Sequence, residues 1–354
     1  MSERVAIIYN EPGISKYHDL GEGSAVDGVV DSVMAVSCAL NESGYEAFTL
    51  ALTPPLSTTE EELSKLDVDI VFNLFEGFDG WPESEAAIAM YLENAGLCFT
   101  GCSSKTLRAC ENKVLVKKCL RAYGISTPNW QVSYPGCPGK ISPDFPCIVK
   151  PLGEHASHGL SAKSVVNDFQ DLKKQVEFIW QAYQRHSLIE EFLPGREFRG
   201  LVMGNRHLKV FPIEEIIYNL PPDKPRLLTY SAKWVRGDEY FTGTSEQCPA
   251  NIDSNLRSEI EELVSDSFRA LGCRGYASID LRQNREGELM VIDVNPNTDI
   301  SIGGGARFPI EAVGISYNSF IDEILYLAKE SNGRRKPKNK YPVIEGLQPS
   351  MISS

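Results

Sequence analysis

The first hundred residues alternate short, continuous apolar runs with longer stretches of helical periodicity. Residues 5–9 (Val-Ala-Ile-Ile-Tyr) form one such run, and residues 68–74 form another. Between them, residues 27–43 carry apolar side chains at helical spacing, and Gly44 follows where a helix would end. Buried strands that alternate with helices form parallel sheets with both faces covered. We therefore expect residues 1–102 to form a small parallel α/β domain.

The end of the run at 68–74 is acidic. In parallel sheets, ligands bind beyond the carboxyl ends of the strands, and Glu76 lies at such an end, with Asp79, Glu83 and Glu85 close in sequence. We expect Glu76 to contact a substrate, whose amino group or cationic side chain this acidity would suit. The alternative is that these acidic residues only complement a helix dipole.

The whole chain, at 354 residues, is too long for one core, because domains rarely exceed 250 to 300 residues. We expect two further units, at residues 103–186 and 187–330, followed by a basic, mobile tail at 331–354. The pattern predicts a single helix over 104–123 and a strand that Pro151 ends. Residues 215–247 lack periodicity and are predicted to form a long functional loop.

Charge and hydropathy exclude two classes of partner. The net charge of −13 argues against nucleic acid, and no apolar run approaches the roughly 20 residues that span a membrane. The nine cysteines include no Cys-x-x-Cys pair, which favours buried free thiols in a reducing compartment. Met1 to Arg4 runs directly into a strand without a signal peptide. We expect a cytoplasmic protein.

Two strands near the C-terminus carry hard oxygen donors. Asp280 lies in the apolar strand at 275–282, and Asp293 lies in the next strand, at 288–294, with Asn295 just beyond it. Carboxylate and amide oxygens of this kind bind Mg²⁺ that also holds nucleotide phosphates. Buried carboxylates on adjacent strands need a cation or other partners. The alternative is that these are merely polar residues at strand ends.

Further motifs follow one another in a fixed order. Lys113 lies in the predicted helix, and Lys150 ends a buried strand before a proline. The loop at 154–159 (Glu-His-Ala-Ser-His-Gly) is rich in small residues, which let backbone N–H groups approach a phosphate. Residues 190–198 read Glu-Glu-Phe-Leu-Pro-Gly-Arg-Glu-Phe, and Lys233 lies in the aperiodic segment.

In this order the motifs at 104–302 resemble the ATP-grasp fold, and the chain to about residue 330 is similar to the D-alanine–D-alanine ligase family. The resemblance implies an α/β (α+β) ATP-grasp fold preceded by a small parallel pre-ATP-grasp domain. It also implies an ATP- and Mg²⁺-dependent ligase that forms an amide bond between two small amino-acid-like substrates through an acyl phosphate. A homodimer is expected by the same resemblance.

The resemblance also implies roles for individual residues. Asp280, Asp293 and Asn295 would hold two Mg²⁺ ions, and Ser157 and Lys233 would reach the phosphates as catalytic groups. The residues that would bind ATP are Lys113, Lys150, Ser157, Glu190, Phe192, Leu193, Glu197 and Lys233. His155 and His158 are unusual in the loop pattern, and could contact a ligand or face solvent.

Three positions depart from the family pattern. Ser278 stands where the family has an arginine that stabilises the oxyanion, so we expect Arg307, or secondly Arg274, to replace it. Ala156 and Trp234 replace a serine and a tyrosine that a glutamate orients, and Asp27 aligns with that glutamate. The candidate substrate residues are therefore Asp27, Glu76, Asn297, Asp299 and Arg307.

Two other functions remain open from sequence. The chain could add an amino acid to a protein or carrier, or it could be an ATP-grasp phosphotransferase that forms no amide. A run of glycines at 303–305 beside Arg307 suggests close backbone approach to a ligand, although it could be a simple flexible loop.

Overall fold

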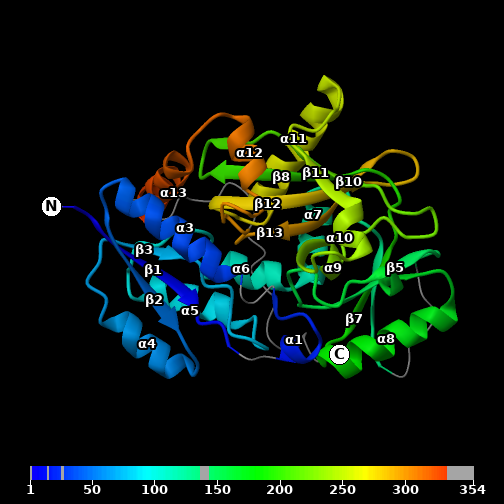
Figure 1. The fold of residues 1–354 in the computed structure, drawn as a ribbon, viewed down its shortest axis with the longest axis horizontal. Coiled ribbons are helices and arrows are strands. Elements are labelled where there is room, and N and C mark those ends of the chain that lie inside the picture. Colours follow the sequence, from blue (N-terminus) through cyan, green and yellow to red (C-terminus); the bar gives the residue numbers. More distant parts are fainter. Residues whose placement is uncertain (1, 14–15, 25–27, 136–142, 333–354) are drawn as a thin grey trace.

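A computed structural model of the chain describes residues 2–13, 16–24, 28–135 and 143–332. Asp27 and the tail from residue 333 lie outside the described residues, whereas 331 and 332 end the last helix. Figure 1 shows three groups of strands, with helices around them. None of the described helices is long and apolar enough to cross a membrane.

The N-terminal unit contains the predicted parallel sheet. Its strands are β1 (Arg4–Asn10), β2 (Glu46–Leu52) and β3 (Ile70–Asn73), in the order β2-β1-β3. Its helices are α1 (Lys16–Asp19), α3 (Val29–Glu42), α4 (Leu56–Ser64) and α5 (Ser84–Asn94). All four residues of β3 are buried, as expected for a strand covered on both faces.

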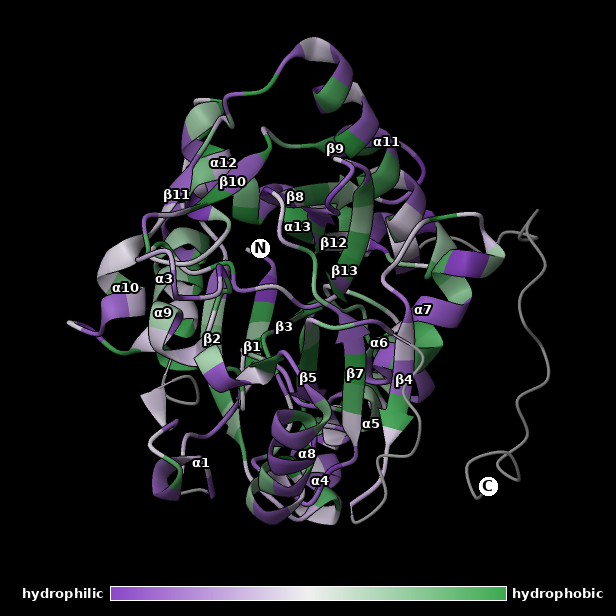
Figure 2. Cartoon of the chain, turned by 90° about the vertical axis from the view of Figure 1, so that its right-hand side faces the viewer, coloured by the Kyte–Doolittle hydropathy of each residue, from purple (hydrophilic) through white to green (hydrophobic). Residues whose placement is uncertain are grey.

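The central unit is an antiparallel sheet in the order β4-β7-β5-β6. The strands are β4 (Trp130–Ser133), β5 (Cys147–Pro151), β6 (Val165–Val166) and β7 (Ser187–Glu191), and a 3₁₀ turn spans Ala162–Ser164. Helix α8 (Phe169–Tyr183) packs its apolar face on this sheet, and Figure 2 shows hydrophilic and hydrophobic residues alternating along it. The side chain of Asp168 caps this helix by accepting from the amides of Gln170 and Asp171.

The C-terminal unit is a larger antiparallel sheet in the order β11-β10-β8-β12-β13, with β9 paired to β8. Its strands are β8 (Glu197–Gly204), β9 (Leu208–Val210), β10 (Glu214–Tyr218), β11 (Thr244–Gln247), β12 (Gly275–Gln283) and β13 (Leu289–Asn295). Helices α11 (Ser254–Ala270), α12 (Arg307–Ala312) and α13 (Tyr317–Asn332) complete it. Helix α13 returns to pack against α3 and β3 (Figure 1).

Two expectations about these elements are wrong. The single helix over 104–123 is two helices, α6 (Ser104–Glu111) and α7 (Lys113–Ala122). Asn112 between them has extended backbone, and its side chain accepts from the amides of Val114 and Leu115, so it caps a new helix. The segment 215–247 contains most of β10, then α9 (Tyr230–Trp234), α10 (Glu239–Gly243) and β11, so it is not a structureless loop.

Candidate active site

A cavity of about 1830 Å³ lies among residues from all three units. Its wall includes the ends of β5, β7, β12 and β13, the loop 154–158 and part of α3. Single small-molecule sites usually occupy 300 to 1,000 Å³, so this volume has room for more than one ligand. The predicted residues that line it are Glu76, Lys113, Lys150, Ser157, Glu190, Phe192, Leu193, Glu197, Lys233, Asp280, Asp293, Asn295, Asn297 and Asp299.

Two lysines form ion pairs with one buried carboxylate in the wall of this cavity. Glu190 and Lys117 are each 2% exposed, and Glu190 forms ion pairs with Lys117 and with Lys150, the latter at 2.6 Å. Burial alone would raise the pKa of Glu190, but the two lysines hold it below its ordinary value. Glu190 therefore acts here as the anchor of two ammonium groups.

Sequence reasoning missed Lys117. It follows Lys113 by four residues, so both side chains lie on one face of α7. Lys113 reaches Asp293 at 3.2 Å, whereas Lys117 turns to Glu190 and donates to the hydroxyl of Thr127 at 2.9 Å. The four-residue spacing between Lys113 and Lys117 is the sequence feature from which Lys117 could have been predicted.

Asp280 and Asp293 face each other across β12 and β13, where their Cα atoms are paired. Asp293 contacts Lys113, and Asp280 contacts Nε of Arg199 at 3.2 Å. Burial would raise the pKa of Asp293, but Lys113 and Lys150 hold it well below its ordinary value. Burial raises the pKa of Asp280 although Arg199 opposes the rise. Protein cations therefore compensate the buried charge at Asp280 only partly.

These side chains fit a Mg²⁺ site in which the protein supplies only part of the ligands. Two opposed carboxylates and the amide of Asn295, at the end of β13, are oxygen donors, which Mg²⁺ prefers. Within the described ranges no three His, Cys, Asp or Glu side chains gather as a complete cage. Mg²⁺ usually takes one or two carboxylates and completes its shell with water and phosphate, so this incomplete set agrees with such a site.

The segment after β7 forms another part of the wall. The amide of Phe192 donates to the carbonyl of Pro146 at 3.0 Å. The Oε2 atom of Glu197 accepts from the hydroxyl of Tyr218 and from Arg282, both at 2.7 Å. Glu197 is thus fixed in a buried position that opens on the cavity.

The loop at 154–160 covers the cavity from the central unit. Ala156 and Ser157 have φ angles of 52° and 61°, in the left-handed region that side chains rarely adopt. Two bonds tie this strained stretch to the segment 228–234: Ser157 Oγ donates to the carbonyl of Leu228 at 3.3 Å, and Trp234 Nε1 donates to the carbonyl of Ala156 at 3.3 Å. Lys233 lines the cavity nearby, and its pKa is lowered by burial and by Arg199.

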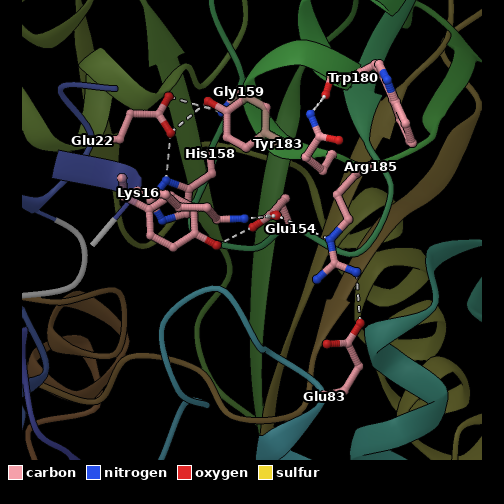
Figure 3. Close-up of polar contacts among 11 residues, drawn as sticks. Lys16, Glu22, Glu83, Glu154, His158, Gly159, Trp180, Tyr183 and Arg185 are labelled. Carbon is pink, nitrogen blue, oxygen red and sulfur yellow. Dashed lines mark hydrogen bonds and ion pairs between the residues drawn. The ribbon is translucent and has the colours of Figure 1, made fainter. Parts of the chain in front are cut away.

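The N-terminal segment holds the same loop from the other side, as Figure 3 shows. The carboxylate of Glu22 accepts from the amide of Gly159 at 3.1 Å and from the hydroxyl of Tyr183 at 2.9 Å, and lies 2.8 Å from Nδ1 of His158. The ring of His158 also stacks on Tyr17 at 4.0 Å. His158 is thus a buried loop anchor, while His155 lines the cavity.

Glu154 is the second anchor of the loop. It accepts from the hydroxyl of Tyr17 at 2.5 Å and pairs with Lys16 at 3.1 Å. Arg185 lies 3.5 Å from Glu154 and 2.9 Å from Glu83 at the start of α5 (Figure 3). The chain therefore joins its N-terminal unit to the covering loop through polar contacts that span more than 130 residues of sequence.

Replacing Glu22 with alanine should loosen the covering loop. The change removes the acceptor of the Gly159 amide and a partner of both Tyr183 and His158. One or two net hydrogen bonds are worth about 1–2 kcal/mol, so hydrogen exchange at residues 155–160 should accelerate roughly 10-fold. Hydrogen-exchange mass spectrometry measures this, with the exposed Glu60→Ala as control. Equal exchange in both variants would contradict the anchoring role.

The substrate residues predicted from sequence are only partly brought together. Glu76 and Asp299 line one end of the cavity, and the amide nitrogen of Asn297 donates to Glu85 at 2.8 Å and to the carbonyl of Phe75 at 3.1 Å. Asn297 thus fastens its loop to the N-terminal unit. Asp27 lies outside the described residues.

Arg307 and Arg274 do not line the cavity. We had expected one of them to take the role of the family arginine that is absent at Ser278. Arg307 begins α12, where its Nε pairs with Glu311 one turn later at 2.9 Å, with 47% of its side chain exposed. Arg274 donates to the carbonyl of Gly101, at the far end of β12. Arg199 on β8 does line the cavity, beside Asp280 and Gly305.

Comparisons with known proteins agree with this geometry. The family model described as "D-ala D-ala ligase C-terminus" matches residues 140–326. The chain is 32% identical to an uncharacterised protein of Sinorhizobium fredii, over 85% of this chain and 87% of that protein. It is 30% identical to a D-alanine–D-alanine ligase of Carboxydothermus hydrogenoformans, over 85% and 93%.

Solved structures share the fold. The Bacillus anthracis D-alanine–D-alanine ligase complexed with ATP superposes with a TM-score of 0.72 at 20% identity, covering 94% of this chain and 99% of that one. The VanG D-Ala:D-Ser ligase of Enterococcus faecalis gives a TM-score of 0.67 at 19% identity, covering 93% and 100%. The expected fold, an ATP-grasp fold behind a small parallel α/β domain, is confirmed.

Proposed function

Because this chain belongs to the D-alanine–D-alanine ligase family, we propose that it joins two small amino-acid-like molecules through an acyl phosphate, with ATP and Mg²⁺. The observation that carries the proposal is the arrangement of the cavity wall. Lys113, Lys150 and Lys233 face it together with the opposed carboxylates of Asp280 and Asp293. Catalysis of phosphoryl transfer depends on positioning and charge stabilisation of this kind.

The reaction balances as two displacements. A substrate carboxylate oxygen attacks the γ-phosphorus of ATP, the bond to the β-phosphate oxygen breaks, and ADP leaves. The amine of the second substrate then attacks the acyl carbon, loses a proton, and inorganic phosphate leaves with the original carboxylate oxygen. Carboxylate and amine alone would form only a salt. The covering loop at 154–160 would exclude water from the reactive acyl group.

The nucleotide would lie against the central unit. Lys150, with Lys117 behind it, places positive charge where phosphate oxygens would bind. The backbone around Phe192 and Leu193 would meet the adenine edge, and Glu197 would accept from ribose hydroxyls. Ser157 would donate to a phosphate from the covering loop. We propose residues 1–102, 103–186 and 187–330 as the three domains that enclose this site.

Asp280, Asp293 and Asn295 would hold Mg²⁺, because their oxygens are the donors that this ion prefers. When bound, Mg²⁺ neutralises charge that develops on phosphate oxygens. Lys113 would then exchange its contact with Asp293 for one with the nucleotide. The lowered pKa of Lys233 reflects its burial, and an ammonium there would face the transferred phosphoryl group.

We assign stabilisation of the oxyanion to Arg199 in place of Arg307. Its guanidinium is mostly buried, lies beside Asp280, and lines the cavity next to the glycine run. A Cβ atom at Gly305 would lie 3.1 Å from its Nη1, so glycine at this position leaves room around the guanidinium.

Arg199→Met should lower kcat about 100-fold, because one preorganised oxyanion donor typically contributes 10²–10³ in rate. The KM for ATP should change little. Arg307→Met is the matched control and should leave kcat within about twofold, since Arg307 is half exposed and pairs with Glu311. Steady-state phosphate release measures both. The reverse ranking of the two variants would restore Arg307 to this role.

The proposed function is tested by phosphate release from ATP and Mg²⁺ across pairs of L- and D-amino acids, with mass spectrometry of the products. Release that depends on two amino acids and yields their condensed mass supports the ligase. A phosphorylated single substrate would instead identify a phosphotransferase. Release only with a protein or carrier acceptor would identify the alternative ligase.

A further inference from the structure

Charge divides the cavity wall into two parts. Among the described residues of the N-terminal unit, the charged ones in the wall are all acidic, namely Asp31, Glu76 and Glu85. The lysines and arginines of the wall, within the part of the chain that the structure describes, all come from later residues: Lys113, Lys150, Arg199, Lys233, Arg236 and Arg282. The cations of the wall therefore lie on the proposed nucleotide side, and the charged groups described on the N-terminal side are carboxylates.

Four carboxylates form the core of the acidic end. Glu76 lies at the end of β3, Glu85 begins α5, Glu111 ends α6, and Asp299 follows β13. Burial, with Asp299 adding, raises the pKa of Glu76 to about 8. Burial raises the pKa of Glu85 to about 8 as well, with Glu76 and Glu111 adding to the rise. These side chains therefore repel one another across the part of the cavity that they share.

No ion pair among the described residues stabilises the ionised form of these carboxyl groups. None of the ion pairs formed among the described residues includes Glu76, Glu85, Glu111 or Asp299. Within the described residues, the donors to Glu85 and Asp299 are neutral: Asn297 donates to Glu85, while the Ser32 hydroxyl and the Ser301 amide donate to Asp299. Neutral donors stabilise a carboxylate less than a cation does.

Two further groups at this end lack a partner. The Ser301 side chain, 7% exposed, lines the cavity beside Asp299, and its hydroxyl has no hydrogen bond to any described residue. The Oε1 atom of Glu111 is buried and has no partner within the same residues. Buried polar atoms are rarely left unsatisfied, so the Glu111 oxygen points to a polar ligand in this space, and the Ser301 hydroxyl is open to the same cavity.

We propose that the acidic end binds a substrate whose side chain carries a permanent positive charge, an ammonium or a guanidinium group. This inference rests on the proposed function and names the class of one of its substrates, a basic amino acid. A cation there would reduce the electrostatic repulsion among Glu76, Glu85 and Asp299. A guanidinium also has enough N–H donors to form hydrogen bonds with several of them at once. A bound cation would favour the ionised form of these carboxyl groups, whereas a ligand carboxylate would oppose it.

The loop after β13 carries one of these carboxylates, Asp299, into the cavity wall. Glu76 and Glu85 come from the N-terminal unit, and Asp299 lies on the loop whose Asn297 bonds to Glu85. Gly304 packs against Asp299, where a Cβ atom would lie 2.2 Å from Oδ2. A side chain at 304 would therefore displace this carboxylate, and glycine leaves room for it.

The test compares arginine with citrulline, which has nearly the same shape but no charge, in both L and D forms. Calorimetry measures binding to the full chain, and phosphate release measures turnover with a range of second amino acids. We expect arginine to bind 10- to 100-fold more tightly than citrulline, as one or two charge-assisted hydrogen bonds predict. Glu76→Gln should reduce this preference about 10-fold and leave the KM for ATP unchanged.

Controls separate this inference from the function on which it rests. Glu60→Gln removes an exposed carboxylate of the same unit and should keep the full preference. A preference for arginine without turnover would support the inference and overturn the ligase. Turnover with neutral pairs, and equal binding of arginine and citrulline, would overturn the inference and keep the ligase. If Glu76→Gln lost affinity for arginine and for citrulline by the same factor, that result would also overturn the inference.

Discussion

Asp293→Asn is expected to reduce ATP turnover by about 10³-fold or more. The substitution removes a charged oxygen donor from the proposed Mg²⁺ site, and metal stabilisation of phosphoryl transfer is worth several kcal/mol. It also leaves Lys113 without its carboxylate partner. Phosphate release measured across a range of Mg²⁺ concentrations should show both a lower maximum and a weaker dependence on the metal.

The matched control is Asp266→Asn, which changes an exposed carboxylate on α11 that pairs only with Arg269. Its activity should equal that of the unmodified protein, because exposed pairs contribute little. Thermal unfolding of both variants would establish that each is folded. Normal turnover by folded Asp293→Asn would remove this residue from the metal site.

Glu190→Gln should produce the largest loss of stability, about 3–5 kcal/mol. Breaking a buried ion pair leaves an uncompensated charge, and here two ammonium groups, on Lys117 and Lys150, share the one carboxylate. Urea unfolding followed by tryptophan fluorescence would report it, since Trp130 on β4 lies near Lys117. The exposed Glu177→Gln on α8 is the control and should unfold as the unmodified protein does.

A second substitution sharpens this prediction. Lys117→Met in the Glu190→Gln background removes one of the two unpaired charges, so it should recover part of the lost stability. If the single and double variants were equally unstable, loss of packing rather than uncompensated charge would explain the effect.

Local patterns predicted much of the fold. The buried strands of the N-terminal parallel sheet and the strands β12 and β13 are each encoded by apolar runs that are continuous in sequence. The break at Asn112 was missed because its capping bonds compete with a helical pattern that continues on both sides. The segment 215–247 was misread because its short elements depend on pairing with β8 and on contacts with the loop at 154–160.

Site residues could be predicted from sequence where they belong to a recognisable motif. Asp280, Asp293, Lys150 and Glu190 line one cavity, as the order of motifs predicted, although their roles stay predictions. Arg199 was missed because its place beside Asp280 comes from the pairing of β8 with β12, which sequence spacing does not reveal. The contacts of Glu22 with His158 and Gly159 were missed for the same reason, since about 136 residues separate the partners.

One isotope measurement tests the central claim directly. An amino acid labelled with ¹⁸O in its carboxylate would be supplied with a second amino acid, ATP and Mg²⁺, and the released phosphate analysed by mass spectrometry. An acyl phosphate transfers one labelled oxygen to phosphate for each amide bond formed, and we predict that ratio of one. Amide formation with unlabelled phosphate, or label retained in a phosphorylated amino acid without an amide, would contradict this account.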